Sequence, residues 1–211
     1  MKNSAGKPVL LKMISAIQQN KEYLSEIDGL IGDGDHGMNM NKGFTIFADE
    51  IKDKDISFSG GLDSLGNTLF SRIGGSMGPI YGTIFMSMAE SAKNIEDIDI
   101  ENFAAMLDAG LSALKEIVEA QVGDKTLIDT LAPAADVIRE AAKEGKSFSL
   151  ALKEMKTAAE TGRDSTKELT AKFGRSSRLG ERSRGVLDAG SVSCCLILCA
   201  MADGILEQIR E

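Results

Sequence analysis

The chain has 211 residues, with 32 acidic and 24 basic side chains and a formal net charge of −8. This acidic balance, with eight Phe, two Tyr and no Trp, argues against a nucleic-acid platform, which uses basic stripes and stacking rings. The longest apolar run, 192–202, is far shorter than the ~20 residues of a membrane span, and the N-terminus lacks a signal-peptide core, so we expect a cytoplasmic protein that binds neither nucleic acid nor membrane.

Apolar residues recur every three to four positions along most of the chain, which predicts helices. In chain order the expected helices lie near 7–22, 38–55, 60–73, 78–93, 100–120, 127–144, 147–163 and 190–209. Pro8, Pro79 and Pro133 each lie near an expected helix start, where proline is tolerated. No alternating β-branched run predicts a strand. The predicted fold is therefore all-α, with one domain, 1–211. Because most connections are short, neighbouring helices are expected to be antiparallel, which predicts an up-and-down bundle or barrel of eight helices.

Glycines concentrate in three expected loops, 29–43, 74–82 and 174–190, where the backbone could approach a ligand closely. The three cysteines, Cys194, Cys195 and Cys199, are too close together for a secreted disulfide framework. We therefore expect them to be small buried residues on the last helix.

The first glycine loop carries three neighbouring aspartates, Asp28, Asp33 and Asp35. It formally matches the dinucleotide pattern Gly-x-Gly-x-x-Gly, but a carboxylate ~4 Å from a phosphate oxygen would be repelled by roughly 4 kcal/mol at a dielectric of 20. A calcium EF-hand starting at Asp33 fails because its twelfth position is Phe44 instead of glutamate. Mg²⁺ bridging carboxylates to phosphates removes the repulsion. A solvated acidic turn is the alternative.

His36, the only histidine, follows these aspartates. We expect the neighbouring carboxylates to favour its charged form, which could donate to a phosphoryl oxygen. Asn39 and Asn41 are expected to open the next helix, whose free amides would favour an anion.

Three further segments could bind phosphate, and each also has an ordinary structural interpretation. Gly74, Gly75 and Ser76 offer unhindered amides and a hydroxyl, although a plain helix–helix turn is equally compatible. The segment 123–129 brings in Lys125 but is typical of a turn capped by Asp124 or Thr126. The segment 174–190 is predicted to clamp a polyphosphate against the acidic loop, a solvated charge run being the alternative. It carries four arginines: Arg175, Arg178, Arg182 and Arg184.

In combination and order, the segments 31–41, 74–79, 123–126 and 180–183 with Asp188 resemble the nucleotide-binding L subunit of bacterial dihydroxyacetone kinases. They also resemble the C-terminal domain of single-chain dihydroxyacetone kinases. The resemblance implies an eight-helix barrel that holds ADP or ATP with two Mg²⁺ at one end. By position it implies that Asp28, Asp33 and Asp35 are the metal ligands. It assigns nucleotide contacts to His36, Gly37, Met38, Asn39, Ser76, Met77, Leu127, Arg175, Asp188, Ala189 and Gly190.

The family also implies partners. A separate K subunit holds dihydroxyacetone covalently, and the L subunit delivers the γ-phosphoryl group, with His36 and Arg175 as our candidates for stabilising it. In the phosphotransferase-system branch, bound ADP is recharged by a phosphohistidine carrier, the M subunit, with phosphate from phosphoenolpyruvate. Two alternatives stay open: an ATP-exchanging subunit for another small ketose or triol, and a non-catalytic regulator. A fatty-acid kinase is disfavoured, because its homologous domain resembles Asp-Gly-Asp-Thr-Gly, with threonine at the position that His36 occupies in this chain.

Two positions depart from the usual family pattern. Met77 stands where relatives usually have a small residue, so the hydroxyl of Ser76 is displaced by one place. Ala189 replaces the proline of an Asp-Pro-Gly turn. Both changes affect the expected phosphate contacts and leave the aspartates unchanged.

Overall fold

The computed structural model describes residues 1–209, and within them it has eight α-helices. They are α1 (Lys7–Ile31), α2 (His36–Ile51), α3 (Phe58–Arg72), α4 (Met77–Ser91), α5 (Ile100–Ile117), α6 (Ile128–Lys143), α7 (Phe148–Ser165) and α8 (Ala189–Gln208). Two 3₁₀ segments, η1 (Asn3–Ala5) and η2 (Arg175–Ser183), complete the described chain. Extended pairing within 1–209 is limited to an isolated bridge between Lys2 and Asp97. The all-α prediction is confirmed.

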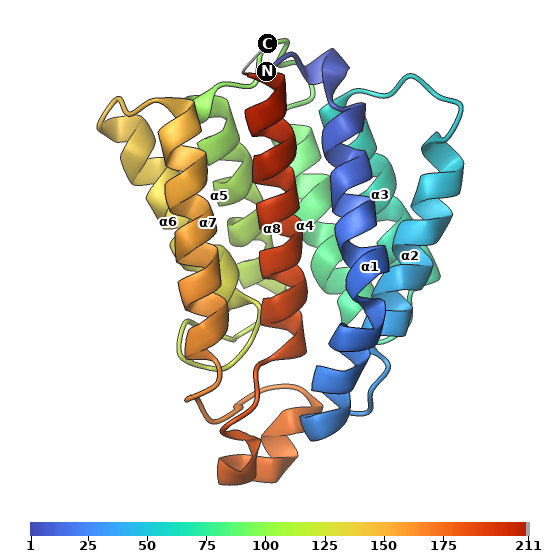
Figure 1. Ribbon diagram of the computed structural model, residues 1–211, viewed down its shortest axis with the longest axis vertical. Coiled ribbons are helices and arrows are strands. Elements are labelled where there is room, and N and C mark those ends of the chain that lie inside the picture. The colour runs from blue at the N-terminus through green and yellow to red at the C-terminus, as the bar shows by residue number, and fades with distance from the viewer. Residues whose placement is uncertain (210–211) are drawn as a thin grey trace.

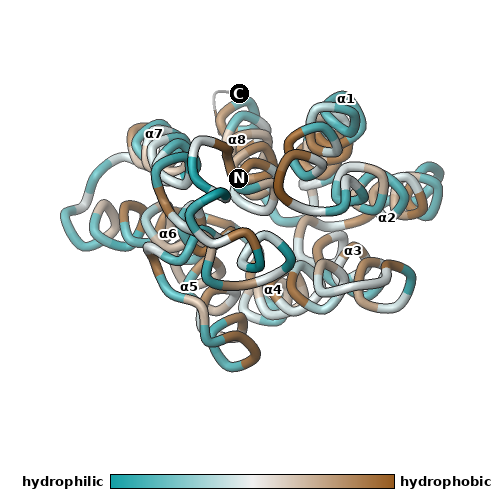
Figure 2. The backbone as a smooth tube through the Cα atoms, turned by 90° about the horizontal axis from the view of Figure 1, so that it is seen from below, coloured by the Kyte–Doolittle hydropathy of each residue, from teal (hydrophilic) through white to brown (hydrophobic). Residues whose placement is uncertain are grey.

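The helices form a closed ring. Each packs against its neighbours in the chain, and α1 packs against α8, so the last helix closes the ring against the first (Figures 1 and 2). Short connections make consecutive helices antiparallel. Local signals support the helix starts: Pro8 lies in the first turn of α1, and the side chains of Ser57, Asp99 and Ser147 accept hydrogen bonds from amides of the first turns of α3, α5 and α7.

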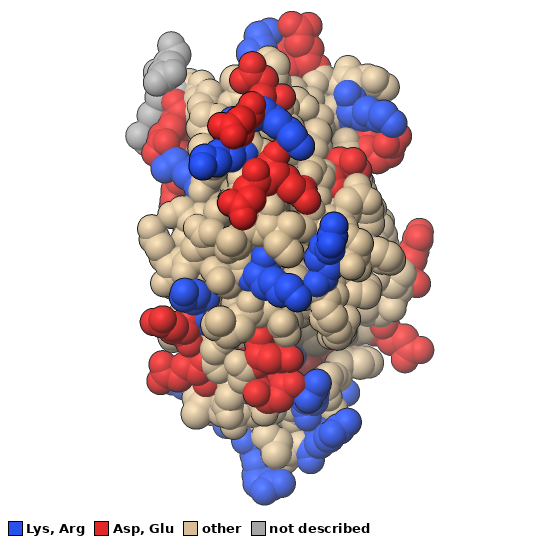
Figure 3. Space-filling view, turned by 90° about the vertical axis from the view of Figure 1, so that its right-hand side faces the viewer, with Lys and Arg blue, Asp and Glu red and all other residues tan. Residues whose placement is uncertain are grey.

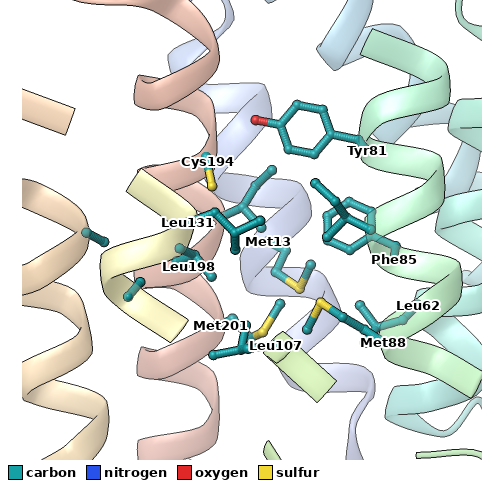
Figure 4. Packing of buried hydrophobic residues seen from close by; sticks show 14 of the residues in the cluster. Met13, Leu62, Tyr81, Phe85, Met88, Leu107, Leu131, Cys194, Leu198 and Met201 are labelled. Carbon is teal, nitrogen blue, oxygen red and sulfur yellow. The ribbon is translucent and has the colours of Figure 1, made fainter. Parts of the chain in front are cut away.

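The interior of the ring is a single apolar core. Side chains from facing helices meet there, including Met13 of α1, Phe85 and Met88 of α4 and Met201 of α8, all at most 2% exposed (Figure 4). By length and composition alone, α8 could cross a membrane, but 78% of its most apolar window is buried inside the bundle. The cysteines of α8 are free; Cys194 and Cys195 are buried as predicted, whereas Cys199 is only partly buried.

Several predicted boundaries were wrong. We expected the first helix to end near residue 22 and a long loop over 29–43, but α1 continues to Ile31 and α2 begins at His36. Asp28 and Gly29 are therefore helical, Asn39 and Asn41 lie inside α2, and the loop shrinks to 32–35. The apolar residues Leu24, Ile27 and Ile31 are buried at helical spacing, and this burial continues α1 through its glycine.

Pro133 is also not at a helix start. It lies six residues into α6, where it has no N–H to donate to the carbonyl of Asp129. A Cβ atom on Gly162 of α7 would lie 2.0 Å from that same carbonyl oxygen. The proline is thus accommodated where glycine allows α7 to approach α6 very closely.

The candidate functional site

The up-and-down topology brings four segments to one end of the barrel, the lower end in Figure 1. These are the turn 32–35 between α1 and α2, the turn 73–76 before α4, the turn 118–127 before α6, and the long connection 166–188 that contains η2. A cavity of about 380 Å³ lies between them. This volume is within the usual range for small-molecule sites.

The acidic cluster forms one wall of this cavity. Asp28 lies on the last turn of α1, and Asp33 and Asp35 lie on the following turn, where Gly34 has a φ of +79°. One carboxylate oxygen from each aspartate lies within 4.8 Å of the others. Three hard oxygen donors at this separation suit a divalent cation such as Mg²⁺, so the residues present fit the predicted metal.

The charges of this cluster are only partly balanced by the protein itself. Burial, and the nearby charge of Asp33, raise the pKa of Asp28 above its usual range. Arg175 places Nη1 2.6 Å from Oδ2 of Asp33, and its charge lowers the pKa of that carboxyl despite an opposing desolvation effect. One guanidinium thus faces three carboxylates, an arrangement that favours binding of further positive charge.

His36 lies at the first position of α2 and is 7% exposed. Its Nε2 is 2.8 Å from Oγ of Ser193, and that hydroxyl is 2.6 Å from the hydroxyl of Tyr81. Our expectation of a charged imidazole was wrong, because burial lowers the pKa of His36 to about 4. Desolvation inside the barrel disfavours the charged imidazole.

The structure brings most of the predicted site residues to the cavity. Its lining includes Asp28, Asp33, Asp35, His36, Asn39, Ser76, Met77, Leu127, Arg175, Asp188, Ala189 and Gly190. Gly37 and Met38 are not among the lining residues. Gly37 lies where α1 and α2 cross, and a Cβ atom there would be 1.8 Å from the carbonyl of Lys21. Met38 is 54% exposed.

The cavity lining combines polar and apolar groups. The carboxylates, Ser76 and Arg175 are polar, and a set of apolar residues lies on or next to α4, α5 and α6. This apolar set consists of Ile80, Leu114, Val118, Leu127 and Ile128. At one side of the opening, Asp188 caps α8 by accepting a hydrogen bond from the amide of Ser191 at 2.7 Å. Burial raises its pKa to about 6.

Of the four arginines in the last glycine-rich segment, Arg175 alone lines the cavity among the described residues. Arg178 and Arg182 are exposed, and Arg184 approaches Glu181 at 3.4 Å on the surface. Figure 3 shows basic side chains gathered at the lower end of the molecule. The predicted opposition of a basic and an acidic segment is therefore present through one arginine.

Sequence reasoning missed several residues that line the cavity or support its lining. Tyr81, which lines it, gave no polar signal within its apolar helix, and Ser193, which contacts His36 and Tyr81 from behind, resembles the other small residues of α8. The turn 123–129 is held mainly by Asp129, whose carboxylate accepts the amides of Gly123 at 2.6 Å and Thr126 at 2.7 Å. We had expected Asp124 or Thr126 in that role, and each contributes one side-chain bond to a backbone amide: Thr126 Oγ1 accepts the amide of Ile128 at 3.3 Å, and Asp124 accepts the amide of Gln121 at 2.8 Å. Lys125 of the same turn lines the cavity and is 1% exposed.

Known proteins have sequences similar to this chain. The family model of the DAK2 domain matches residues 30–203. The chain is 36% identical over 184 residues to the Escherichia coli K12 protein named "PEP-dependent dihydroxyacetone kinase, ADP-binding subunit DhaL", covering 86% of this chain and 87% of that one. It is also 36% identical over 186 residues to the Lactococcus lactis "PTS-dependent dihydroxyacetone kinase, ADP-binding subunit DhaL", covering 86% and 87% of the two chains.

A solved structure supports the fold. The dihydroxyacetone kinase of C. freundii in complex with AMP-PNP and Mg²⁺ superposes with a TM-score of 0.72 at 20% identity. The match covers 92% of this chain and 33% of that longer one. Because the family model spans most of the chain and two relatives exceed one-third identity over nearly their whole length, the chain belongs to the DAK2-domain family.

Proposed function

We propose that this chain is the cytoplasmic ADP-binding subunit of a dihydroxyacetone kinase, a phosphotransferase that works with a separate K subunit. The observation that carries the proposal is the cavity itself, whose lining combines three clustered carboxylates with a set of apolar residues on or next to α4, α5 and α6. This arrangement fits a metal-bound polyphosphate joined to a flat base. Relatives named ADP-binding subunits support the same assignment.

Asp28, Asp33 and Asp35 would hold two Mg²⁺ ions. Magnesium bound there supplies charge neutralisation for the phosphates. The chain's own contribution is a fixed oxygen cluster: the amide of His36 donates to Oδ2 of Asp28 at 3.3 Å, and Gly34 closes the turn in a conformation that side chains rarely adopt. The carboxylates are thereby held near one another before the ligand arrives.

The phosphates would contact the start of α2 and the turn before α4. His36, Gly37, Met38 and Asn39 form the first turn of α2, a helix N-terminus whose positive end favours an anion, although the amides of His36 and Asn39 already donate to Asp28 Oδ2 and to the carbonyl of Asp35. Ser76 and Met77 precede and begin α4. The adenine ring would lie against Leu127, with Asp188, Ala189 and Gly190 completing the site. Because His36 is buried and neutral, it acts as a fixed hydrogen-bonding group towards phosphate oxygens.

Phosphoryl transfer needs mainly positioning and charge stabilisation. Arg175 is the side chain best placed for the second task, because its guanidinium already lies at the carboxylates and a planar fork suits phosphate oxygens. The acceptor must be held elsewhere, since the only histidine, His36, is engaged by Ser193. We therefore propose that dihydroxyacetone is bound by the K subunit. We further propose that ADP stays bound and is recharged by a phosphohistidine carrier, the M subunit, with phosphate derived from phosphoenolpyruvate.

Native mass spectrometry of the purified protein tests the assignment directly. We expect the mass of one ADP and two Mg²⁺ ions, retained through gel filtration. Asp33→Asn and Asp35→Asn should each abolish this retention while leaving the helical circular dichroism intact. Asp63→Asn, a change at an exposed aspartate of α3, is the matched control. Unchanged Mg·ADP affinity in both site variants would refute the proposal, and rapid exchange of bound nucleotide would favour the ATP-exchanging alternative.

A further inference from the structure

The segment that carries Arg175 is a long connection with a closed base. We call residues 167–187 the arginine segment. Its two ends meet where the amide of Gly185 donates to the carbonyl of Lys167 at 2.8 Å. Just outside the segment, the amide of Asp188 donates to Oγ1 of Thr166 at 3.0 Å. Arg175 lies near the far end of this loop, where η2 begins beside α1.

A buried lysine from another part of the chain joins both ends of this loop. The ammonium of Lys125 donates to the carbonyl of Thr166 at 2.5 Å and to the carbonyl of Val186 at 2.5 Å. Its side chain is 1% exposed. A buried ammonium is costly unless it is hydrogen-bonded, so its position depends on these two carbonyls, and they in turn depend on it.

The turn that presents Lys125 is itself held in place. Lys125 is the one non-glycine residue with a positive φ, 62°, among residues 1–209, a conformation that is uncommon outside glycine. The carboxylate of Asp129 accepts the amides on either side of it, from Gly123 and Thr126. The amide of Lys172, inside the arginine segment, donates to the carbonyl of Asp124 at 3.2 Å. The turn before α6 is therefore a platform for the arginine segment.

We propose that Lys125 is a positioning residue: its ammonium fastens the base of the arginine segment so that Arg175 stays over the acidic cluster and helps to retain a nucleoside diphosphate. This inference rests on the proposed function, because it assigns Lys125 an effect on the same site. Lys125 acts through Arg175, and neither the metal nor the phosphates need to touch it. The charge and length of the lysine matter because it joins two main-chain carbonyls, that of Thr166 directly before the segment and that of Val186 near its end.

Hydrogen exchange in the nucleotide-free protein tests the fastening. Lys125→Met keeps the length and apolar stem of the side chain and removes the donor. We expect faster exchange confined to residues 167–187, with the helices unchanged. Lys156→Met is the control, because Lys156 forms a half-buried pair with Asp203 between α7 and α8, away from the site. Unchanged exchange in 167–187, or acceleration spread over the whole barrel, would overturn the proposal.

A double-mutant cycle tests whether Lys125 acts through Arg175. By calorimetry, we expect Lys125→Met to raise the Kd for Mg·ADP by roughly tenfold or more. In an Arg175→Met background the same change should have almost no further effect. Independent, multiplying losses would show that Lys125 does not work through Arg175 and would overturn the assignment. If Lys125→Met does not fold, Lys125→Gln, which keeps one shorter donor, should give intermediate exchange and affinity.

The two proposals fail in different ways. A wild-type protein that does not bind Mg·ADP would refute the proposed function. The exchange experiment contains no nucleotide, so it decides the fastening role of Lys125 whatever the outcome of the binding measurement.

Discussion

At the scale of single residues, the site is governed by which polar groups are buried and which are exposed. His36 and Asp188 both lie at helix starts beside the cavity. Burial favours the neutral form of each side chain: it lowers the pKa of His36 to about 4 and raises the pKa of Asp188 to about 6. Asp33, facing solvent and Arg175, has its pKa lowered instead. The pKa values of these neighbouring groups thus shift in different directions because their burial and nearby charges differ.

Ser193 is central to the placement of His36. Its hydroxyl contacts Nε2 of His36 and the hydroxyl of Tyr81, and it can donate to the carbonyl of Gly190 at 3.1 Å. Ser193→Ala leaves a buried ring nitrogen without its partner, so we expect a loss of about 1–3 kcal/mol in the free energy of unfolding, together with weaker Mg·ADP binding. Denaturant titration and calorimetry measure the two effects.

Tyr81→Phe is the matched comparison, because it removes one hydroxyl and keeps the contact between Ser193 and His36. We expect it to leave nucleotide affinity nearly unchanged. Equal losses of affinity in the two variants would contradict a specific role for Ser193.

Asp188 gives the ligand-free protein a pH dependence of definite sign. Its pKa is raised from 3.8 in the unfolded chain to about 6 in the folded one. Its contribution to stability is therefore complete below about pH 4 and is lost as pH rises through about 6, a change on the order of 3 kcal/mol. Asp188→Asn retains a capping side chain and removes the titration. Between pH 4 and 7.5, the metal-free wild type should lose stability relative to this variant, as measured by denaturant titration. A difference in unfolding free energy that stays constant over this pH range would count against the burial of the Asp188 charge.

At the scale of the elements, close helix crossings place the acidic turn. At Gly37 of α2 a Cβ atom would lie 1.8 Å from the carbonyl of Lys21 and 2.7 Å from the amide of Ser25, so α1 and α2 touch there through their backbones. This contact begins directly after the turn with Asp33 and Asp35. The spacing of the carboxylates is thus coupled to the packing of the two helices.

Two glycine-to-alanine changes separate packing from helix propensity. Gly37→Ala forces the helices apart, and we expect it to destabilise the fold by at least about 3 kcal/mol, in the range of severe overpacking. Gly29 lies in α1, and a Cβ atom there meets its nearest neighbour at an ordinary 3.8 Å. Gly29→Ala should therefore stabilise the protein by roughly 0.5–1 kcal/mol through helix propensity. Thermal unfolding of both variants measures the two effects. Destabilisation by Gly29→Ala would contradict the conclusion that only Gly37, of these two glycines, is closely packed.

At the scale of the whole molecule, ring closure assembles the site from segments that are far apart in the sequence. Contact of α1 with α8 brings His36 to Ser193, 157 positions away, and the long return from α7 to α8 brings Arg175 to Asp33. A ligand that bridges these segments should stabilise the closed barrel as a unit, because it binds the folded state alone.

Saturating Mg·ADP is therefore expected to raise the unfolding temperature. At a free concentration 100 times Kd the gain is about 2.7 kcal/mol, or roughly 5–10 °C for a chain of this size. Removing Mg²⁺ with a chelator should reverse most of the shift, and Asp33→Asn should show almost none. A shift of the same size with ADP in chelator would argue against metal-bridged binding.

Local pattern was sufficient to predict the helices, the short connections and the cluster Asp28, Asp33 and Asp35, because helical periodicity and the spacing of carboxylates within one turn are properties of neighbouring residues. It misjudged the end of α1 and the position of Pro133, where buried apolar contacts and the approach of Gly162 override local propensity. The family resemblance pointed to Arg175 among the four arginines, but local pattern did not, and neither the neutral state of His36 nor the contacts of Lys125 could be read from the sequence. Each depends on burial or on groups brought together by the closed ring, and desolvation and long-range contacts exist only once the chain has folded.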